Sequence, residues 1–398
     1  MGTVFDLELD TCTGCGACIN VCPVQAVEYT EDRYGFLFPM INREKCIECG
    51  LCYNMCPRKS SDIFNKPLQG YAAINTNQDT LMNSSSGGVF SVLAEYVLTL
   101  DGIVFGCTMD SENQVYHTYI DSIDDLSKVT RSKYVQSRSN EIFNRIKEEL
   151  LNERWVLVSG TPCIVAGVKT YLKKYDLSKL ILVDIVCHGV PSQDFFDSYL
   201  RFLNNKYNGI SNYQFRTKIK ANNGMNFFLS YYANKYKKKI VRNWAEDSFN
   251  YLYMNAYIYR ESCYSCRYAK TERVGDLSLC DFWDWDKYHF EFDKAASVSG
   301  ILVNTKKGQA LWKAINSKFI YYDTEISNIV INNGCLSRPS VRPKERDEVL
   351  EFWKSRGYEA LDKEFQKREL LTIWKNKMFR LAPTFVKEMY LNIRKKDN

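Results

Sequence analysis

The sequence is short of histidine and of long apolar runs. No stretch approaches the ~20 apolar residues that a membrane-spanning helix needs, and the most hydrophobic window, residues 180–187, has the length of a strand and contains Asp184. A transmembrane segment is therefore not expected. Three histidines among 398 residues are too few to favour acid–base catalysis by histidine. The N-terminal residues also lack the pattern of a secretion signal, so a disulfide framework is not expected.

Cysteine, in contrast, is abundant, with 15 residues. Eight of them form two runs of the same pattern, C-x-x-C-x-x-C-x-x-x-C-P. In the bacterial ferredoxin arrangement, the first three thiolates of a run bind one iron–sulfur cluster, and the fourth binds the cluster of the other run. The predicted ligands of one 4Fe-4S cluster are Cys12, Cys15, Cys18 and Cys56, and those of the other are Cys46, Cys49, Cys52 and Cys22. The pattern therefore predicts a two-cluster module that transfers electrons.

Zinc is the main alternative for closely spaced cysteines. A structural zinc site takes four ligands, usually as two pairs, and leaves the third cysteine of each run without a use. The proline after each fourth cysteine, Pro23 or Pro57, fixes the backbone where the chain leaves the predicted cluster. A thiol-rich chain without disulfides fits a reducing cytoplasm, and in particular an anaerobic or low-potential cell.

Charge is unevenly distributed along a chain of net charge +6. The first 60 residues are mildly acidic, whereas 216–242 and 363–398 are basic. Nucleic-acid binding is not expected, because neither a strongly basic balance nor a reading module is present. The uneven charge favours docking of a redox partner protein or binding of an anionic cofactor. The segment 374–393 interleaves basic and aromatic residues. It fits peripheral contact with a membrane or a partner, and equally a helix packed on its own domain.

Four segments are expected along the chain. Residues 1–60 form the two-cluster 4Fe-4S ferredoxin-type domain, and 61–80 read as a linker. In 81–345 short apolar strands alternate with helices, which predicts an α/β domain with a mostly parallel sheet. Within it, 214–241 alternates Tyr, Phe and Lys and is typical of an antiparallel hairpin pair. Residues 346–398 are predicted to be a helical, basic C-terminal region.

A second set of cysteines lies in the α/β domain. Cys163 follows a predicted strand at a turn into a helix, and Cys187 ends the next buried strand. Because neighbouring strand ends share the sheet edge at which open α/β sheets bind ligands, these two thiols are expected close together. Cys263 and Cys266 form a C-x-x-C in a loop rich in Tyr and Arg, and this loop would complete four thiolates over that edge. Residue chemistry alone is equally compatible with a third metal site and with unrelated buried thiols.

Five short motifs resemble the coenzyme F420 hydrogenase/dehydrogenase beta-subunit family, in the same order along the chain. The motifs are Ser85–Val89, Ser132–Ser137, Gly160–Cys163, Cys187–Pro191 and Asp276–Trp283. The resemblance runs from about residue 81 to residue 285, and the ferredoxin module in front of it is similar to that of longer members. It implies a flavoprotein that binds FAD and a third 4Fe-4S cluster. The deazaflavin used by some members is not obligatory in this family.

The resemblance also implies functional residues in the α/β domain. The implied ligands of the third cluster are Cys163, Cys187, Cys263 and Cys266. The implied flavin contacts are Ser85, Ser86, Gly87, Gly88, Lys133 and Tyr134. A Ser-Gly-Gly turn at a helix start offers backbone N–H groups to a pyrophosphate, although an ordinary serine N-cap explains the same residues. No catalytic residue is assigned.

The chain departs from the family pattern around Asp-Phe-Trp. Cys280 and Asp284 stand where the family usually has glycine. Because glycine there would permit a close approach of the backbone to a ligand, an altered pocket is expected. Replacement of one of the four proposed cluster ligands by Cys280 is an alternative. The hydride carrier cannot be identified from this motif.

Two functions fit these observations. The first is an iron–sulfur flavoprotein oxidoreductase that passes electrons between 4Fe-4S clusters and, through FAD, a hydride carrier or small organic substrate. A hydride-transfer site needs no histidine base, which fits the scarcity of histidine. The second is an electron-transfer subunit that connects ferredoxin with a partner enzyme, such as a dehydrogenase subunit, without substrate chemistry of its own. Bound FAD that a small molecule reduces would distinguish the first from the second.

Overall fold

The chain divides into two compact units in the computed structural model, which describes residues 3–139, 142–218, 228–292 and 297–382. Unit 1 comprises residues 1–194 and 259–341, and unit 2 comprises 195–258 and 342–398. The predicted domains have different boundaries. Residues 195–258 lie within the predicted α/β domain, yet they pack with the C-terminal helices.

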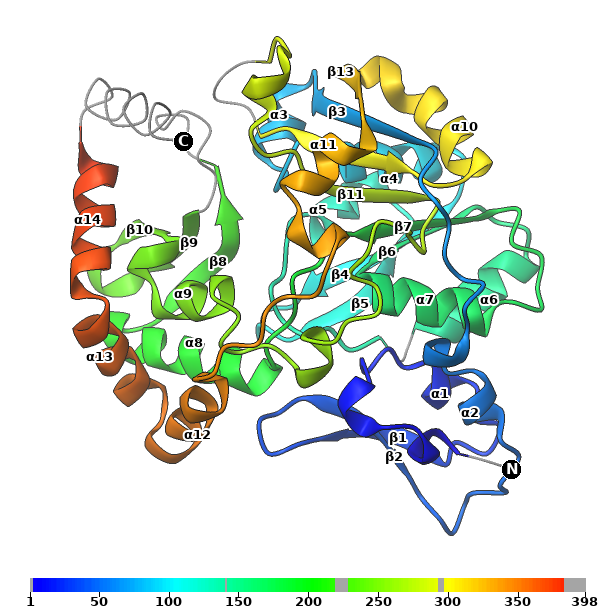
Figure 1. Ribbon diagram of the computed structural model, residues 1–398, viewed down its shortest axis with the longest axis horizontal. Coiled ribbons are helices and arrows are strands. Elements are labelled where there is room, and N and C mark those ends of the chain that lie inside the picture. The colour runs from blue at the N-terminus through cyan, green and yellow to red at the C-terminus, as the bar shows by residue number, and fades with distance from the viewer. Residues whose placement is uncertain (1–2, 140–141, 219–227, 293–296, 383–398) are drawn as a thin grey trace. The chain divides into compact units, whose positions relative to one another are not determined.

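The N-terminal part of unit 1 is a small module with a repeated local structure (Figure 1). Its elements are the 3-10 helices η1 (Val4–Asp6), η2 (Leu9–Thr11) and η3 (Pro57–Lys59), helices α1 (Ala17–Asn20) and α2 (Leu51–Asn54), and the antiparallel strands β1 (Val27–Glu31) and β2 (Leu37–Ile41). Each α-helix begins after a glycine in the left-handed region, Gly16 with φ 85° and Gly50 with φ 72°. A side chain there would be strained, so both runs require glycine at this turn.

A mixed sheet of eight strands forms the centre of unit 1, in the order β13-β3-β12-β11-β7-β6-β4-β5. The strands are β3 (Gln69–Asn75), β4 (Ile103–Met109), β5 (Val115–Ile120), β6 (Val156–Gly160), β7 (Leu180–Ile185), β11 (Leu277–Asp281), β12 (Ser299–Val303) and β13 (Phe319–Thr324). The four neighbours β11, β7, β6 and β4 run parallel. Antiparallel strands extend the sheet on both sides. The predicted α/β domain with a parallel sheet is confirmed, with the parallel strands at its centre.

Helices cover both faces of this sheet. They are α3 (Gln78–Met82), α4 (Val89–Thr99), α5 (Leu126–Val129), α6 (Ile142–Leu151), α7 (Pro162–Tyr171), α10 (Lys306–Ile315) and α11 (Ile326–Ile331). Along β6, Val156 and Val158 pack with residues of α6 and α7, and Leu157 between them packs with residues of α4 and α10. Burial on both faces explains why the strands read as continuous apolar runs rather than as alternating patterns.

The predicted linker, 61–80, contains a strand of the sheet. Strand β3 lies between β12 and β13, and all its residues except Gln69 are buried. Its small and apolar residues fit a sheet interior, but the neighbouring Pro67 and Gly70 suggest a linker in the sequence. The partners of β3 lie more than 200 residues away in the chain, so no local signal indicates the pairing.

Unit 2 is built around an aromatic core. It contains most of α8 (Gln193–Tyr207), the antiparallel strands β8 (Ile210–Thr217), β9 (Phe228–Ala233) and β10 (Lys238–Asn243), and helices α9 (Ser248–Met254), α12 (Arg346–Arg356), α13 (Tyr358–Arg368) and α14 (Leu370–Leu381). The Tyr199 and Phe249 rings stack with centroids 5.1 Å apart, and Phe195 and Trp353 are 4.8 Å apart. The antiparallel strands and the C-terminal helices agree with the sequence prediction.

Helix α14 has an open apolar stripe. Leu370, Leu371, Trp374 and Met378 are exposed, while the helix contacts the 3-10 helix η6 (Trp244–Glu246) of the same unit. Helix α14 therefore packs on its own unit and also leaves an apolar surface open. The rest of the predicted segment, 383–393, lies outside the described residues. Within the part of the chain that the structure describes, no helix is both long and apolar enough to span a bilayer.

Candidate iron–sulfur centres

The first predicted ligand set comes together in the N-terminal module. Burial raises the pKa of the Cys18 thiol well above its usual value, and negative charge on Cys15, Cys12 and Cys56 raises it further. Cys56 belongs to the second run and lies near the first set, whereas the exchange of the fourth ligand stays a prediction. Thiols this close to one another and shielded from water cannot all ionise without a compensating positive charge, which the iron of a cluster would supply.

In the second set, a cysteine of the first run is the neighbour. Burial raises the pKa of Cys52, on α2, and the charges of Cys22 and Cys46 act in the same direction. Cys22 is the fourth cysteine of the first run, and its Sγ accepts a hydrogen bond of 3.2 Å from the Ala26 backbone N–H. Cys49 precedes the glycine turn into α2. Among the described residues, no group of three or more His, Cys, Asp or Glu side chains has the geometry of a single-ion site. A cubane cluster holds its thiolates farther apart than one ion does, so this result does not bear on the cluster prediction.

The contacts of the Arg58 guanidinium show whether the first cysteine set suits an anionic cluster. Its Nε donates a 3.3 Å hydrogen bond to the Cys56 Sγ, and its Nη1 donates to the Glu8 carbonyl and to Thr11 Oγ1. Its Nη2 is buried and has no hydrogen-bond partner among the described residues. A buried guanidinium with a spare donor beside a cysteine sulfur fits a negatively charged group at that sulfur. The residues present therefore fit a 4Fe-4S cluster.

The four cysteines implied for a third cluster also meet. Cys163 is the second residue of α7, Cys187 follows β7, Cys263 ends the 3-10 helix η7 (Glu261–Cys263), and Cys266 follows in the same loop. Burial raises the pKa of Cys187 well above its usual value, and the charges of Cys263, Cys163 and Cys266 add to this effect. Burial raises the pKa of Cys263 to about 12 and that of Cys266 to about 11, with Cys266 and Cys163, respectively, as the next causes.

Cys280 interacts with other residues than these four cysteines. Its Sγ donates to the Gly300 carbonyl at 3.5 Å across the β11–β12 pair. Burial raises the pKa of Cys280, and the charges that affect it most are those of Asp281 and Arg273. Its surroundings therefore do not favour the alternative in which Cys280 replaces one of the four ligands.

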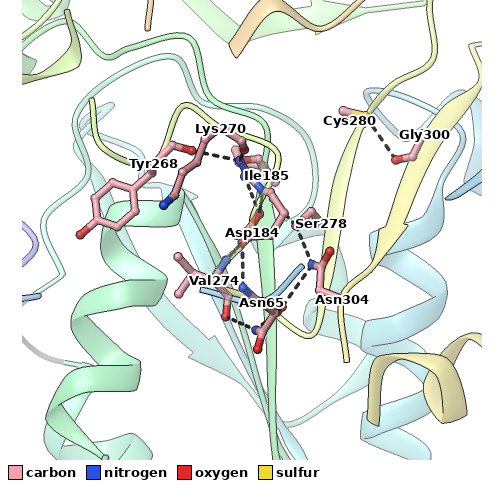
Figure 2. Close-up of polar contacts among 12 residues, drawn as sticks. Asn65, Asp184, Ile185, Tyr268, Lys270, Val274, Ser278, Cys280, Gly300 and Asn304 are labelled. Carbon is pink, nitrogen blue, oxygen red and sulfur yellow. Dashed lines mark hydrogen bonds and ion pairs between the residues drawn. The ribbon is translucent and has the colours of Figure 1, made fainter. Parts of the chain in front are cut away.

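A buried ion pair anchors the loop that follows the C-x-x-C (Figure 2). Asp184 of β7 is 0% exposed and Arg273 is 1% exposed. The Asp184 Oδ1 accepts hydrogen bonds from Arg273 Nε at 3.1 Å and Nη2 at 2.6 Å, and its Oδ2 accepts the backbone N–H groups of Val274 at 3.0 Å and Gly275 at 2.8 Å. Arg273 Nη1 also donates to the Tyr268 carbonyl at 3.1 Å. The carboxylate thereby fixes the loop to the strand that leads into Cys187.

Further polar contacts surround the ion pair in Figure 2. Asn304 Nδ2 donates to Ser278 Oγ at 2.9 Å and to the Gly275 carbonyl at 3.1 Å. Asn65 exchanges backbone hydrogen bonds with Arg273 at 2.7 and 2.8 Å. These contacts join residues from β11, from the end of β12 and from the chain before β3. Sequence analysis did not identify this network, although Asp184 is visible as the polar residue in an apolar strand.

The two segments implied to contact a flavin are neighbours in the structure. The Ser132 backbone N–H donates to Ser85 Oγ at 2.9 Å. Gly87, however, uses its N–H for a 2.8 Å bond to Ser299 Oγ. A Cβ on Gly87 would lie 2.2 Å from the Ala73 carbonyl oxygen, so close packing against the sheet already requires glycine here. Gly88, with φ 86°, is the N-cap of α4.

Of the remaining implied flavin contacts, two side chains form hydrogen bonds within the protein and one is partly exposed. Ser86 Oγ donates to the Val298 carbonyl at 3.2 Å, and Tyr134 is partly exposed. The Lys133 ammonium donates to the Thr130 carbonyl at 2.5 Å. Burial lowers the pKa of Lys133 to about 8, and the charge of Cys107 opposes this change.

Cys335 and His188 form a pair near the third thiol set that the sequence did not reveal. Cys335 Sγ lies 3.5 Å from His188 Nδ1. Burial, the largest single cause, acts to raise the pKa of Cys335, but the hydrogen bond and charge of His188 together with a hydrogen bond to Ser340 outweigh it, and the pKa is lowered. More than 140 residues separate the two positions in the chain, so no spacing signal could have found the pair.

Comparisons with known proteins bear on the family and the module. Residues 153–327 match the C-terminal region of the beta subunit in the family described as "Coenzyme F420 hydrogenase/dehydrogenase", and residues 11–60 match the "4Fe-4S dicluster domain". The predicted family is confirmed for residues 153–327, and the predicted iron–sulfur module for residues 11–60. Neither description names a flavin, so FAD stays a prediction.

A chain of the F420-reducing [NiFe] hydrogenase complex from Methanosarcina barkeri, from a xenon derivatization study, superposes with a TM-score of 0.44 at 16% sequence identity. The superposition covers 78% of this chain and 96% of that chain. No curated protein sequence matches significantly.

Proposed function

We propose that this chain, which joins a 4Fe-4S dicluster domain to a domain of the coenzyme F420 hydrogenase/dehydrogenase beta-subunit family, is an iron–sulfur flavoprotein oxidoreductase. It connects three 4Fe-4S clusters, through FAD, with a hydride carrier or a small organic substrate. A redox protein such as ferredoxin or a dehydrogenase subunit exchanges electrons with the N-terminal module, in a reducing compartment such as the cytoplasm. The observation that carries the proposal is the convergence of Cys163, Cys187, Cys263 and Cys266 beside the N-terminal module.

The order of the three thiol sets supports a relay. Cys52 of the second set is among the charges that raise the pKa of the buried Cys18 in the first set. Likewise, burial and then charges that include Cys163 of the third set raise the pKa of Cys15. The Cβ and Sγ of Cys15 also lie 3.2 Å from where a Cβ on Gly167 of α7 would be. The first set is therefore the neighbour of both others, which puts it in the middle of the series.

The flavin part of the proposal rests on the meeting of two motif segments. When bound, FAD accepts two electrons as hydride and releases them one at a time to iron–sulfur centres. The backbone N–H groups of Gly88 and of the first turn of α4 have no acceptor within the helix. Ser85 lies next to this turn. Lys133 donates to backbone carbonyls, so the proposal assigns it a role as a neighbouring positive charge rather than as a direct phosphate ligand.

The second candidate is an electron-transfer subunit without substrate chemistry of its own. The observation that favours it is that Gly87 and Lys133, two of the six implied flavin contacts, direct their donors into the protein. In this case the chain holds its clusters and hands electrons to a partner that carries the substrate site. Flavin content separates the two candidates.

Anaerobic purification with iron, sulfide and flavin counts tests the proposal. Three cubane clusters require about twelve irons per chain, and the dicluster module alone requires about eight. Cys163→Ala should lower the count by about four irons, whereas Cys280→Ala, the matched control at a cysteine that is also partly buried but lies outside the set, should leave it unchanged. About eight irons in the wild-type protein, or equal iron loss in both variants, would contradict the third cluster. Twelve irons without flavin would support the second candidate.

A further inference from the structure

Arg260 connects the third thiol set with the first. It precedes η7, and its carbonyl accepts the Cys263 backbone N–H at 3.0 Å, while its own N–H donates to the Val190 carbonyl at 2.9 Å. Its side chain extends the other way, and Nε donates a 2.7 Å hydrogen bond to the Cys12 carbonyl. The backbone of Arg260 is thus part of the loop that holds the third set, and its guanidinium reaches a cysteine of the first set.

The guanidinium is buried with two unused donor groups. Arg260 is 1% exposed, and its Nη1 and Nη2 have no hydrogen-bond partner among the described residues. The centroid of the Phe38 ring lies 3.9 Å from the Arg260 Cζ, and this cation–π contact offsets only part of the cost of burying the charge. Negative charge beside Nη1 and Nη2 would compensate the rest.

Cysteine sulfurs are the source of negative charge nearby. On one side, the Arg260 carbonyl accepts the backbone N–H of Cys263, a cysteine of the third set. On the other side, a Cβ on Gly14, between Cys12 and Cys15, would lie 3.8 Å from Nη1. Four thiolates per cluster leave each cubane with a net negative charge, and an added electron increases it. A buried cation therefore stabilises the reduced form of a cluster on either side.

We propose that Arg260 is a buried cation shared by the first and third clusters, and that it raises the reduction potentials of both. The inference rests on the proposed function and adds a positioning residue to it. The step it serves is the movement of one electron between the two clusters, in which one cluster is oxidised, the other is reduced, and no bond is formed or broken. The second cluster, held by Cys22, Cys46, Cys49 and Cys52, does not share this cation.

Redox titration followed by electron paramagnetic resonance tests the proposal in the full-length, anaerobically purified protein. Arg260→Met should lower the midpoint potentials of the first and third clusters by at least 59 mV, which corresponds to a tenfold change in a one-electron equilibrium. The potential of the second cluster should stay unchanged. Arg260→Lys keeps the charge, so its midpoint potentials should stay close to those of the wild-type protein. Arg138→Met is the matched control, because Arg138 pairs with Glu31 at the surface with its side chain 48% exposed, and it should shift none of the potentials.

The outcomes separate this inference from the proposed function. An iron count of about eight in the wild-type protein overturns the third cluster, and the shared cation with it. A count of about twelve in Arg260→Met with unchanged potentials overturns the role of Arg260 alone. If Arg260→Met loses iron, its potentials cannot be compared, and the Arg260→Lys variant then tests the proposal. Wild-type iron and near-wild-type potentials in Arg260→Lys support the shared cation. If Arg260→Lys also loses iron, the role of Arg260 is purely structural, and the proposal is overturned.

Discussion

Replacing Arg273 by methionine should release the loop that follows Cys263 and Cys266. Methionine keeps an unbranched side chain of similar bulk but removes the charge and all five donors. Asp184 is 0% exposed and would keep only the N–H groups of Val274 and Gly275 as partners. A carboxylate that water cannot reach would then lack its cation.

The structure sets the size of the effect. Breaking a buried ion pair by removing one partner costs about 3–5 kcal/mol. The Asp184–Arg273 pair belongs in this class, because both side chains are buried and the Oδ1–Nη2 distance is 2.6 Å. Since about 1.4 kcal/mol is a factor of ten, the loop should open roughly 100- to 4,000-fold more often. Arg273→Met combined with Asp184→Asn should recover part of the loss, because the uncompensated charge is then gone.

Hydrogen exchange of the Val274 and Gly275 amides is the direct measurement, since both donate to Asp184 Oδ2. Faster exchange there should accompany faster removal of iron from the proposed third cluster by a chelator, while the iron of the dicluster domain stays unaffected. Arg138→Met again serves as control, because an exposed pair contributes at most about 1 kcal/mol. Unchanged exchange at Val274 and Gly275 in a folded Arg273→Met protein would refute the assignment of the ion pair as the anchor.

Two further predictions concern stability. Gly87→Ala should destabilise the fold by at least about 3 kcal/mol, because its Cβ would meet the Ala73 carbonyl oxygen at 2.2 Å. Gly334→Ala, with nothing within 4 Å of the new Cβ, should change the denaturation midpoint little, and equal losses would contradict the packing argument. Burial raises the pKa of Asp247 to about 6 from 3.8, so the folded state binds its proton more tightly than the unfolded chain does. Stability should therefore fall by up to about 3 kcal/mol as pH rises from about 4 to 6. Asp247→Asn, which still offers an acceptor to Tyr199, should remove that fall in denaturation series at several pH values, and an unchanged pH profile would contradict the assignment.

The sequence by itself determined the dicluster module. The spacing of the two cysteine runs and the glycine turns before α1 and α2 all lie within 60 residues. Short-range spacing suffices because the pattern predicts three ligands of each cluster from one short loop. The sequence also predicted the parallel strands β6 and β7 with α7 between them, since apolar runs separated by an amphipathic helix leave few alternatives.

Only the tertiary structure decided the rest. Cys163, Cys187 and the Cys263–Cys266 loop are separated by dozens of residues, so their meeting depends on the order of β6, β7 and β11 in the sheet rather than on spacing. The positions of Arg260 and of the Asp184–Arg273 pair depend on the same packing. Strand β3 and the composition of unit 2 were missed for the same reason, because their contacts join segments that are remote along the chain. Local patterns specify local geometry, whereas a site assembled from several strand ends exists only once the sheet has formed.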